Sequence, residues 1–473
     1  MSVNSTLKPE DFQTQNLLLI PEYVILRQDA IKNYAILVSD GRFTDVGPER
    51  ELINRYPDKK QIQLPGKIIM PGFIDAHHHL TQSFGKALAF GEPSEIFRRI
   101  WVPLERHLDQ ELVYLAGKLA ALESLRGGFT TVVDAGTRAE VKLDPLVQAV
   151  SEAGIRCVLG LICNDKVGEQ KPSDILKQAE KHLYRWPDDG LIHPSLAISI
   201  PEVASDDMLY AVASLCKEAG VVFQTHVNEH LAAVERSLVE RGLRPLEHLY
   251  SIDALHSHTL IAHATLLTSH ELSLLKDTDT AVAYNPVATQ WKGNATAPAM
   301  LMHEMGIRFG IGTDSTRSDG FRLVDAAEAT QRIAFGLGSG DFSTGGGWPW
   351  LDHATTGGAE AISLSDITGE IAKGKAADFL IVDIDVPEFH PSRDIIWELT
   401  RYGNKDQIEA VFVAGQLRLW HGWPTDWDGK ALMREVSQRV NEAIDQAPIQ
   451  KIHPSSTEHH RLYQAFLDNK RKK

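Results

Sequence analysis

Cysteine is scarce in this sequence, and the cysteines present form no recognisable motif. The 473 residues include only three of them, Cys157, Cys163 and Cys216. Three thiols spread over a chain of this length provide no disulfide framework, and no Cys-x-x-Cys pair is present to bind zinc through thiolates. These absences favour a protein that works in a reducing compartment and argue against a cysteine-based metal site.

Long hydrophobic runs are also missing. The apolar run 17–20 ends at Pro21 and follows no basic segment, so it does not have the form of a signal peptide. No apolar run approaches the roughly 18 residues that a membrane-spanning helix needs. We therefore expect a cytoplasmic protein that does not enter a membrane.

The sequence has too little positive charge to favour a polyanionic partner. It carries 48 Lys and Arg against 63 Asp and Glu, a formal net charge of −15. This balance is typical of a solvated acidic surface and argues against nucleic acid or an anionic membrane as a standing partner. We expect a small-molecule substrate instead.

The sequence does contain a regular alternation of short apolar runs and helical patterns. Eight strand-like runs lie at 68–76, 130–134, 156–161, 196–200, 221–226, 260–263, 281–284 and 308–313. Helical patterns separate most of them, for example at 110–126, 145–153, 206–219 and 269–276. Alternation of this kind predicts an α/β protein with a closed parallel (β/α)8 barrel of the TIM type. An open doubly wound sheet is the alternative, but no Gly-x-Gly-x-x-Gly follows any of the runs.

The two ends of the chain contain strand-like segments that do not belong to the alternation of strands and helices in the middle. Segments 23–26 and 35–47 alternate around an Asp-Gly turn, and 377–383 and 409–419 are also strand-like. We predict a small β-sandwich domain built from residues 1–67 and 368–425. The barrel then occupies residues 68–367, and residues 426–473 form a C-terminal helical extension.

Four of the apolar runs stop on a histidine or an aspartate. The residues at these ends are His77 and His79, His226, His263 and Asp314. In a parallel barrel the carboxyl ends of all strands meet at one face, where the active site lies. Because alternate residues of an extended strand share a side, His77 and His79 can converge on one ion, whereas His78 points away.

Three histidines and a carboxylate at one face make a poor hydrophobic core but a plausible site for a single divalent metal ion. Glu229, three residues after His226, can shuttle protons beside such a metal, or it can be a first-turn glutamate that interacts with a helix dipole. Asp314 can ligate the metal, accept a proton, or cap a helix. His263 alone is equally compatible with a hydrogen-bonded core histidine.

With their flanking residues, these motifs resemble those of the amidohydrolase superfamily. The similar segments are 71–79, 226–229, 261–263, 312–315 and 370–378, so the resemblance covers nearly the whole chain. It is greatest to the branch of cytosine-deaminase-like and triazine aminohydrolases and chlorohydrolases. Such enzymes are often homo-oligomers, and by analogy we expect a dimer or a larger assembly.

The resemblance implies roles for the strand-end residues. One divalent metal ion, zinc in the first place and iron or cobalt as alternatives, would be held by His77, His79, His226 and Asp314. The metal would lower the pKa of a water molecule, and Asp314 would accept its proton. Glu229 would protonate a ring nitrogen and then the leaving group, and His263 would orient the water and stabilise charge. Segment 196–200 contains no lysine of the kind that bridges two metals, which favours a mononuclear site.

The substrate is less well defined. Gln82, three residues after His79, is similar in position to a glutamine of members that act on oxopurine or triazine rings, and its amide can both donate to and accept from a ring edge. The segments after strands four, seven and eight depart from the family's usual patterns, among them Ile200-Pro201-Glu202 in place of Pro-His. A glycine- and tryptophan-rich segment, 336–350, is either a mobile lid or a surface connection.

The leading hypothesis is a metal-dependent hydrolase that releases ammonia or an amine from a nitrogen heterocycle such as an oxopurine, pterin or triazine. Hydrolysis of an amide, urea or carbamate C–N bond, or dechlorination of a ring, at the same mononuclear site is the first alternative. A metal-free scaffold barrel is the second, and the retention of His77, His79, His226 and Asp314 argues against it.

Overall fold

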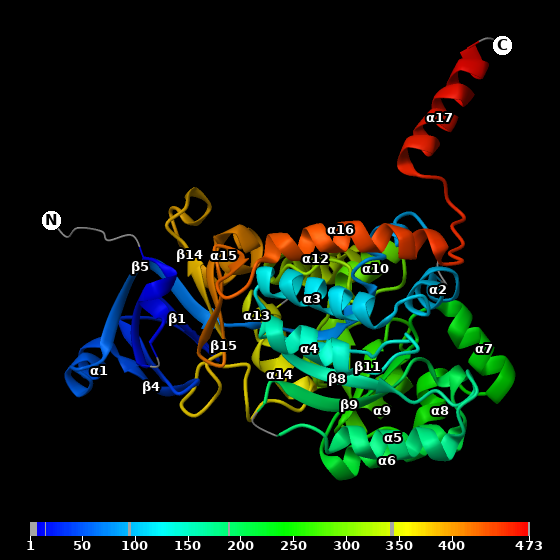
Figure 1. Ribbon diagram of the computed structural model, residues 1–473, viewed down its shortest axis with the longest axis horizontal. Helices are drawn as coiled ribbons and strands as arrows, with labels where there is room; N and C mark the ends of the chain where they lie inside the picture. Colours follow the sequence, from blue (N-terminus) through cyan, green and yellow to red (C-terminus); the bar gives the residue numbers. More distant parts are fainter. Residues whose placement is uncertain (1–6, 15, 93–95, 188–189, 341–344, 472–473) are drawn as a thin grey trace.

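The computed structural model describes residues 7–14, 16–92, 96–187, 190–340 and 345–471. It consists of a barrel of parallel strands with a mixed sheet beside it (Figure 1). The barrel strands follow one another in space in chain order, and every neighbouring pair is parallel. They are β6 (Phe73–His78), β7 (Phe129–Asp134), β8 (Arg156–Ile162), β9 (Ile192–Ile198), β10 (Phe223–Val227), β11 (Thr259–His263), β12 (Ala281–Tyr284) and β13 (Phe309–Ile311).

The last strand of the barrel returns to the first. Asp314 N, just after β13, donates to His77 O of β6 over 2.9 Å. The approach is so close that a Cβ on Gly312 would lie 2.9 Å from His77 Cβ, so only glycine fits there. The predicted (β/α)8 barrel is confirmed.

Helices cover the outside of the barrel, as the sequence predicts. The predicted helices at 110–126, 145–153, 206–219 and 269–276 are confirmed to within one residue at each end. The helices that follow the barrel strands are α3 (Gln110–Arg126), α4 (Asp144–Ala153), α5 (Pro172–Leu183), α6 (Asp206–Ala219), α7 (Leu231–Arg241), α8 (Pro245–Ser251), α9 (Ser269–Asp277), α10 (Pro286–Lys292), α11 (Ala299–Met305), α12 (Gly320–Ser339), α13 (Trp348–His353) and α14 (Thr356–Ala361).

One predicted strand is wrong in its first part. The apolar run 68–76 was expected to be a single barrel strand, but Ile68 to Pro71 end the long strand β5 (Lys60–Pro71) of the other sheet. The barrel strand begins at Phe73, after Gly72, where a Cβ would lie 2.2 Å from Thr130 Cγ2. Both halves of the run are buried and apolar, so hydrophobicity alone does not reveal that the chain passes from one sheet to the other.

The small β domain draws its strands from both ends of the chain. Its order is β17-β16-β15-β14-β5-β1-β3-β4, with β2 beside β1, and β14 pairs antiparallel with β5. Phe43 on β4 lies 5.9 Å, centroid to centroid, from Phe379 on β14, although three strands separate them in the sheet order. The sheet therefore folds back on itself around an apolar core. The strands are β1 (Asn16–Leu26), β2 (Asp29–Lys32), β3 (Tyr34–Ser39), β4 (Arg42–Pro48), β14 (Phe379–Asp383), β15 (Ile408–Val413), β16 (Gln416–Trp420) and β17 (Trp423–Pro424).

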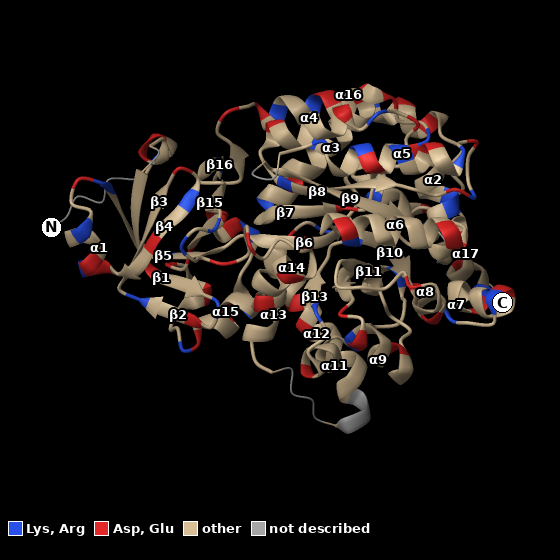
Figure 2. Ribbon diagram, turned by 90° about the horizontal axis from the view of Figure 1, so that it is seen from below, with Lys and Arg blue, Asp and Glu red and all other residues tan. Residues whose placement is uncertain are grey.

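The C-terminal extension is helical. Helix α16 (Gly429–Gln446) lies along α3 and buries Leu432 and Val440, whereas α17 (Ser456–Arg471) projects from the body and has no buried residue (Figure 1). Positions of basic and of acidic residues are interspersed along the outer helices (Figure 2). No helix in the described ranges is both long and apolar enough to cross a membrane.

The glycine-rich segment 336–350 is mostly helical where the structure describes it. Residues 336–339 complete α12, and Trp348 to Trp350 begin α13, with Trp350 fully buried. Residues 341–344 of the segment lie outside the described residues. None of the described residues of this segment lines the pocket discussed below.

A buried ion pair joins the barrel to the small domain. The guanidinium of Arg156 on β8 donates to both oxygens of Asp378, over 3.0 and 3.3 Å. Asp378 also accepts from Thr368 Oγ1 over 2.7 Å and from Ala414 N over 2.6 Å. Because neither charge reaches water, each depends on the other for its solvation.

We expect Asp378→Ala to destabilise the protein by about 3–5 kcal/mol, because it leaves the Arg156 guanidinium buried and unpaired. The shift of the urea unfolding midpoint measures the effect. Glu111→Ala is the matched control, since it removes an exposed pair with Arg439 of 2.7 Å and should cost about 1 kcal/mol or less. Equal shifts for the two variants would contradict the role given to Arg156 and Asp378.

Candidate metal centre and active site

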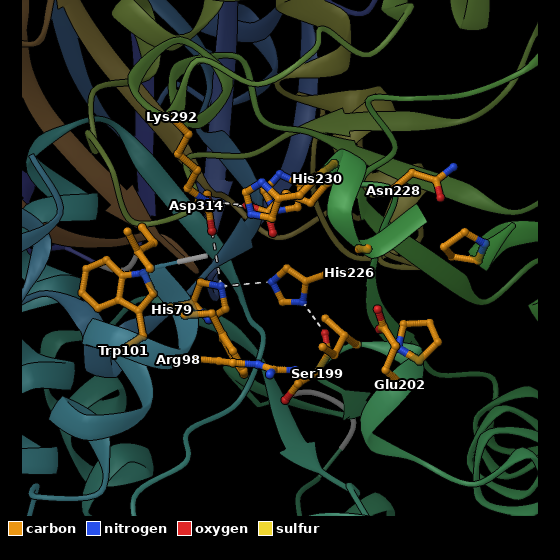
Figure 3. A pocket seen from close by; sticks show the side chains of 18 of the residues that line it. His79, Arg98, Trp101, Ser199, Glu202, His226, Asn228, His230, Lys292 and Asp314 are labelled. Carbon is orange, nitrogen blue, oxygen red and sulfur yellow. Dashed lines mark hydrogen bonds and ion pairs between the residues drawn. The ribbon is translucent and has the colours of Figure 1, made fainter. Parts of the chain in front are cut away.

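The structure brings the four predicted metal ligands together at the carboxyl end of the barrel. The ligand atoms of His77, His79, His226 and Asp314 all lie within 4.8 Å of one another. Asp314 Oδ1 is 3.4 Å from His77 Nε2 and 3.3 Å from His79 Nε2. The Nε2 atoms of His79 and His226 are 3.3 Å apart (Figure 3). Four side chains from three strands thus face one point.

The hydrogen bonds around these histidines prepare their nitrogens for a metal. His226 Nδ1 lies 2.7 Å from the Ser199 carbonyl oxygen, so it carries the proton and leaves the Nε2 lone pair free. His77 Nε2 is buried and has no hydrogen-bond partner among the described residues. A buried ring nitrogen without a partner costs free energy, and a cation at this point would remove that cost. The residues therefore fit a divalent metal.

His78 does not point at this group. Its Nδ1 lies 2.9 Å from Asp75 Oδ2 and 2.9 Å from Thr313 Oγ1, and His78 belongs to neither group of candidate metal ligands among the described residues. The alternation of side chains along the strand thus separates His77 and His79 from His78, as the spacing predicts.

The backbone turns sharply at three of the strand ends. Asn228, His263 and Asp314 have φ values of 55°, 75° and 51°, in the left-handed region that side chains other than glycine rarely adopt. Such strained residues are found where a protein needs a side chain in a particular place. Here the turns direct His263 and Asp314 into the centre as the chain leaves the barrel.

Glu229 and His263 lie beside the four ligands. Glu229 Oε2 is 3.7 Å from His263 Nε2, which in turn is 4.0 Å from Asp314 Oδ2. His230 Nε2 lies 3.2 Å from the other oxygen of Glu229. Glu229 and His263 therefore lie directly beside the candidate metal-ligand group, with which they share Asp314 as a neighbour.

One residue of the centre was missed by the sequence analysis. Lys292 Nζ donates to Glu229 Oε1 over 2.7 Å and to Asp314 Oδ2 over 2.8 Å. Lys292 is the last residue of α10, eight positions after β12 ends at Tyr284, so a search of strand ends does not find it. The one sequence feature that could have pointed to Lys292 is its position at the end of the helix that follows barrel strand β12.

Burial and charge set the protonation of these groups. Burial lowers the pKa of His79 to about 3 and of His263 to about 4, and that of His226 well below its ordinary value, so all three rings are neutral near pH 7. Burial alone would raise the pKa of Glu229, but the neighbouring His263 and Lys292 outweigh it and hold that pKa well below its usual value. Neutral imidazoles beside ionised carboxylates are the forms that bind metals.

A pocket opens from the metal centre to the surface (Figure 3). Its walls come from the segments after β6, β7 and β9 and from α7. They include Ile96, Phe97, Arg98, Trp101, Arg138, Ile200, Pro201, Glu202 and Arg236. Apolar and aromatic walls with a few charged groups are typical of a site for a small organic molecule.

Gln82 lies at the wall of this pocket. It ends the short 3-10 helix Leu80–Gln82 that follows β6, and it lines both the pocket and an adjoining cavity bounded by Phe90 and Trp291. Of the residues singled out from the sequence, six line this pocket: His79, Gln82, His226, Glu229, His263 and Asp314. His77 lies within the same ligand group.

Known proteins show similarity along most of the chain. The amidohydrolase family model matches residues 68–418. A 5-methylthioadenosine/S-adenosylhomocysteine deaminase of Bacillus cereus is 28% identical over 87% of this chain and 95% of its own length. Among solved structures, a zinc-bound adenosine deaminase of Xanthomonas campestris has a TM-score of 0.84 at 24% identity, over 91% of this chain and 98% of its own.

Two further structures share the fold. A zinc complex of the atrazine chlorohydrolase TrzN of Arthrobacter aurescens has a TM-score of 0.78 at 20% identity, covering 90% of this chain and 100% of its own. Guanine deaminase of E. coli has a TM-score of 0.75 at 19% identity, covering 86% and 100%. The matched region contains the whole barrel and every residue of the centre, and the chain belongs to the amidohydrolase family of metal-dependent hydrolases.

Proposed function

We propose that this protein hydrolyses the exocyclic C–N bond of a nitrogen heterocycle, such as an oxopurine, pterin or triazine, and releases ammonia or an amine. The observation that carries the proposal is the position of Glu229 and His263, which face the metal-ligand group from one side of the pocket. The deaminases among the similar proteins support the reaction class. The substrate depends on the pocket walls, which come largely from connecting segments between the strands and helices of the barrel.

We further propose that the resident metal is one zinc ion, held by His77, His79, His226 and Asp314. Three imidazole nitrogens and a carboxylate suit zinc, which iron or cobalt can replace in such a donor set. Zinc is present in the adenosine deaminase and chlorohydrolase structures with this fold. When bound, the ion lowers the pKa of a water molecule and so supplies a nucleophile at neutral pH.

The protein side chains then divide the remaining work. Glu229 is ionised; it would accept one proton at Oε2 and pass it to a ring nitrogen, and it would then transfer a second proton, the one that Asp314 has accepted, to the leaving amine. His263, neutral and 3.7 Å from that oxygen, orients the reacting groups. Asp314 accepts a proton on the metal side. Trp101 and Phe97 provide apolar surface for the face of a flat ring, and Gln82 can donate to and accept from its edge.

The partner molecule in this proposal is a small substrate, and the assembly is a homo-oligomer of two or more copies. The second point comes from analogy with the family, and static light scattering of the purified protein measures it.

Ammonia or amine release from a panel of aminopurines, aminopterins and aminotriazines tests the reaction. We expect turnover of at least one class by the zinc-loaded enzyme. If no compound of the panel releases ammonia or an amine, and an amide, urea or carbamate is cleaved, the same centre would be assigned to acyl C–N hydrolysis instead. Absence of bound metal, with no affinity for added zinc, iron or cobalt, would instead support a scaffold barrel.

Glu229→Gln should retain the metal and lower kcat by about 10²–10⁴, because the amide cannot accept the proton and no ligand is lost. Metal content is measured beside turnover, and Glu235→Gln, an exposed change on α7, is the control. Normal turnover in Glu229→Gln would show that the proton moves through another group.

His226→Ala should abolish metal retention, since it removes one of three nitrogen donors and leaves a space in the centre. Elemental analysis after desalting checks this, with circular dichroism to show that the barrel is folded. His107→Ala, at an exposed histidine whose Nδ1 lies 2.9 Å from Pro103 O, should retain the metal of the wild type. A full metal equivalent in His226→Ala would remove His226 from the ligand set.

A further inference from the structure

Lys292 has no part in this mechanism, although it contacts two carboxylates of the centre at hydrogen-bond distance. The lysine extends from the end of α10 to the carboxylates of Glu229 and Asp314, and Figure 3 shows it beside Asp314. Its Nζ lies 2.7 Å from Glu229 Oε1 and 2.8 Å from Asp314 Oδ2. Its side chain is 15% exposed, so the ammonium is largely withdrawn from water and depends on these two partners.

Lys292 Nζ donates to one oxygen of each carboxylate and does not bind the other oxygen. Asp314 Oδ1, the oxygen that Lys292 does not bind, faces His77 and His79. Glu229 Oε2, likewise unbound by Lys292, faces His263. Lys292 therefore orients both carboxylates. Asp314 Oδ1 points toward the metal-ligand histidines, and Glu229 Oε2, the proton-accepting oxygen, points toward His263.

A second group of ligand atoms lies beside the first. Glu229, His263 and Asp314 offer atoms within 4.8 Å of one another, close enough to hold a cation themselves. Asp314 belongs to both groups, an arrangement in which a shared carboxylate can bridge two metals. The ammonium of Lys292 lies against the two carboxylates of this second group, so it supplies the positive charge that a second ion would otherwise bring.

We propose that Lys292 is a positioning residue that stands in for a second metal ion. It keeps the centre mononuclear, and it keeps Glu229 off the metal so that Oε2 stays available to move a proton. The first part concerns metal binding alone, whereas the second rests on the proposed function, since it uses the role of Glu229 in hydrolysis.

Metal stoichiometry tests the first part without any substrate. Wild type, Lys292→Met and Lys292→Arg are incubated with excess zinc, desalted and analysed for metal and protein. We expect one equivalent in wild type and in Lys292→Arg, which keeps the charge, and two in Lys292→Met. Lys276→Met is the matched control, because Lys276 donates to Gly306 O on the outside of the barrel and should leave the count at one.

One equivalent in Lys292→Met, or two in Lys292→Arg, would overturn the exclusion of a second ion. If Lys292→Met does not fold, Lys292→Gln replaces it, since the amide can donate to both carboxylates without carrying charge. The same expectation of two equivalents applies to that variant.

Turnover tests the second part, on whichever compound the wild type converts. We expect Lys292→Met to lower kcat about 100-fold with KM changed little, because the carboxylates lose their orientation while the pocket walls stay in place. Lys292→Arg should recover part of the loss. A wild-type kcat in Lys292→Met would overturn the positioning role. If the wild-type enzyme converts none of the compounds, that result counts against the proposed function, and the metal stoichiometry alone then tests the role of Lys292.

Discussion

A buried carboxylate, Asp75, helps to close the barrel at the place where the metal ligands lie. Asp75 on β6 accepts from Thr313 N over 2.9 Å and from Thr313 Oγ1 over 2.5 Å, just after β13. It also accepts from His77 N over 3.2 Å. These bonds join the first strand to the last and fix the backbone on both sides of the centre. The relative position of His77 and Asp314, which no local sequence preference sets, follows from this closure.

The charge balance of the centre depends on the same geometry. Glu229 and Asp314 are both withdrawn from water, and two neighbouring carboxylates without a cation would be costly to bury. Lys292 offsets part of that cost in the protein alone, and the metal offsets the rest. The chain as a whole carries a net charge of −15. The positively charged side chains that line this pocket, Lys292 among them, are therefore a local arrangement and do not follow from the overall composition.

Much of the fold and the centre could be predicted because both follow from short-range rules. Apolar runs separated by amphipathic segments predict the barrel, and the carboxyl ends of its strands predict where His226, His263 and Asp314 meet. The rules fail where a contact is made far along a connecting helix, as for Lys292, or where one buried run serves two sheets, as around Gly72. The resemblance to a family supplied the roles of the side chains, which spacing alone left open.

The walls of the pocket show why the substrate is harder to derive than the reaction. Phe97 and Trp101 belong to the segment after β6, and this segment is fastened to the C-terminal extension. Glu92 accepts from Ile452 N over 3.0 Å and from His453 N over 3.3 Å, and it pairs with Arg99 over 2.8 Å. Glu92, near the start of the barrel, thus binds the linker between α16 and α17, which lies more than 350 positions later in the chain. Because this wall of the pocket is tied to the C-terminal extension, we expect a change in the extension to alter which substrate is bound. The strand ends, and the chemistry they carry, would stay the same.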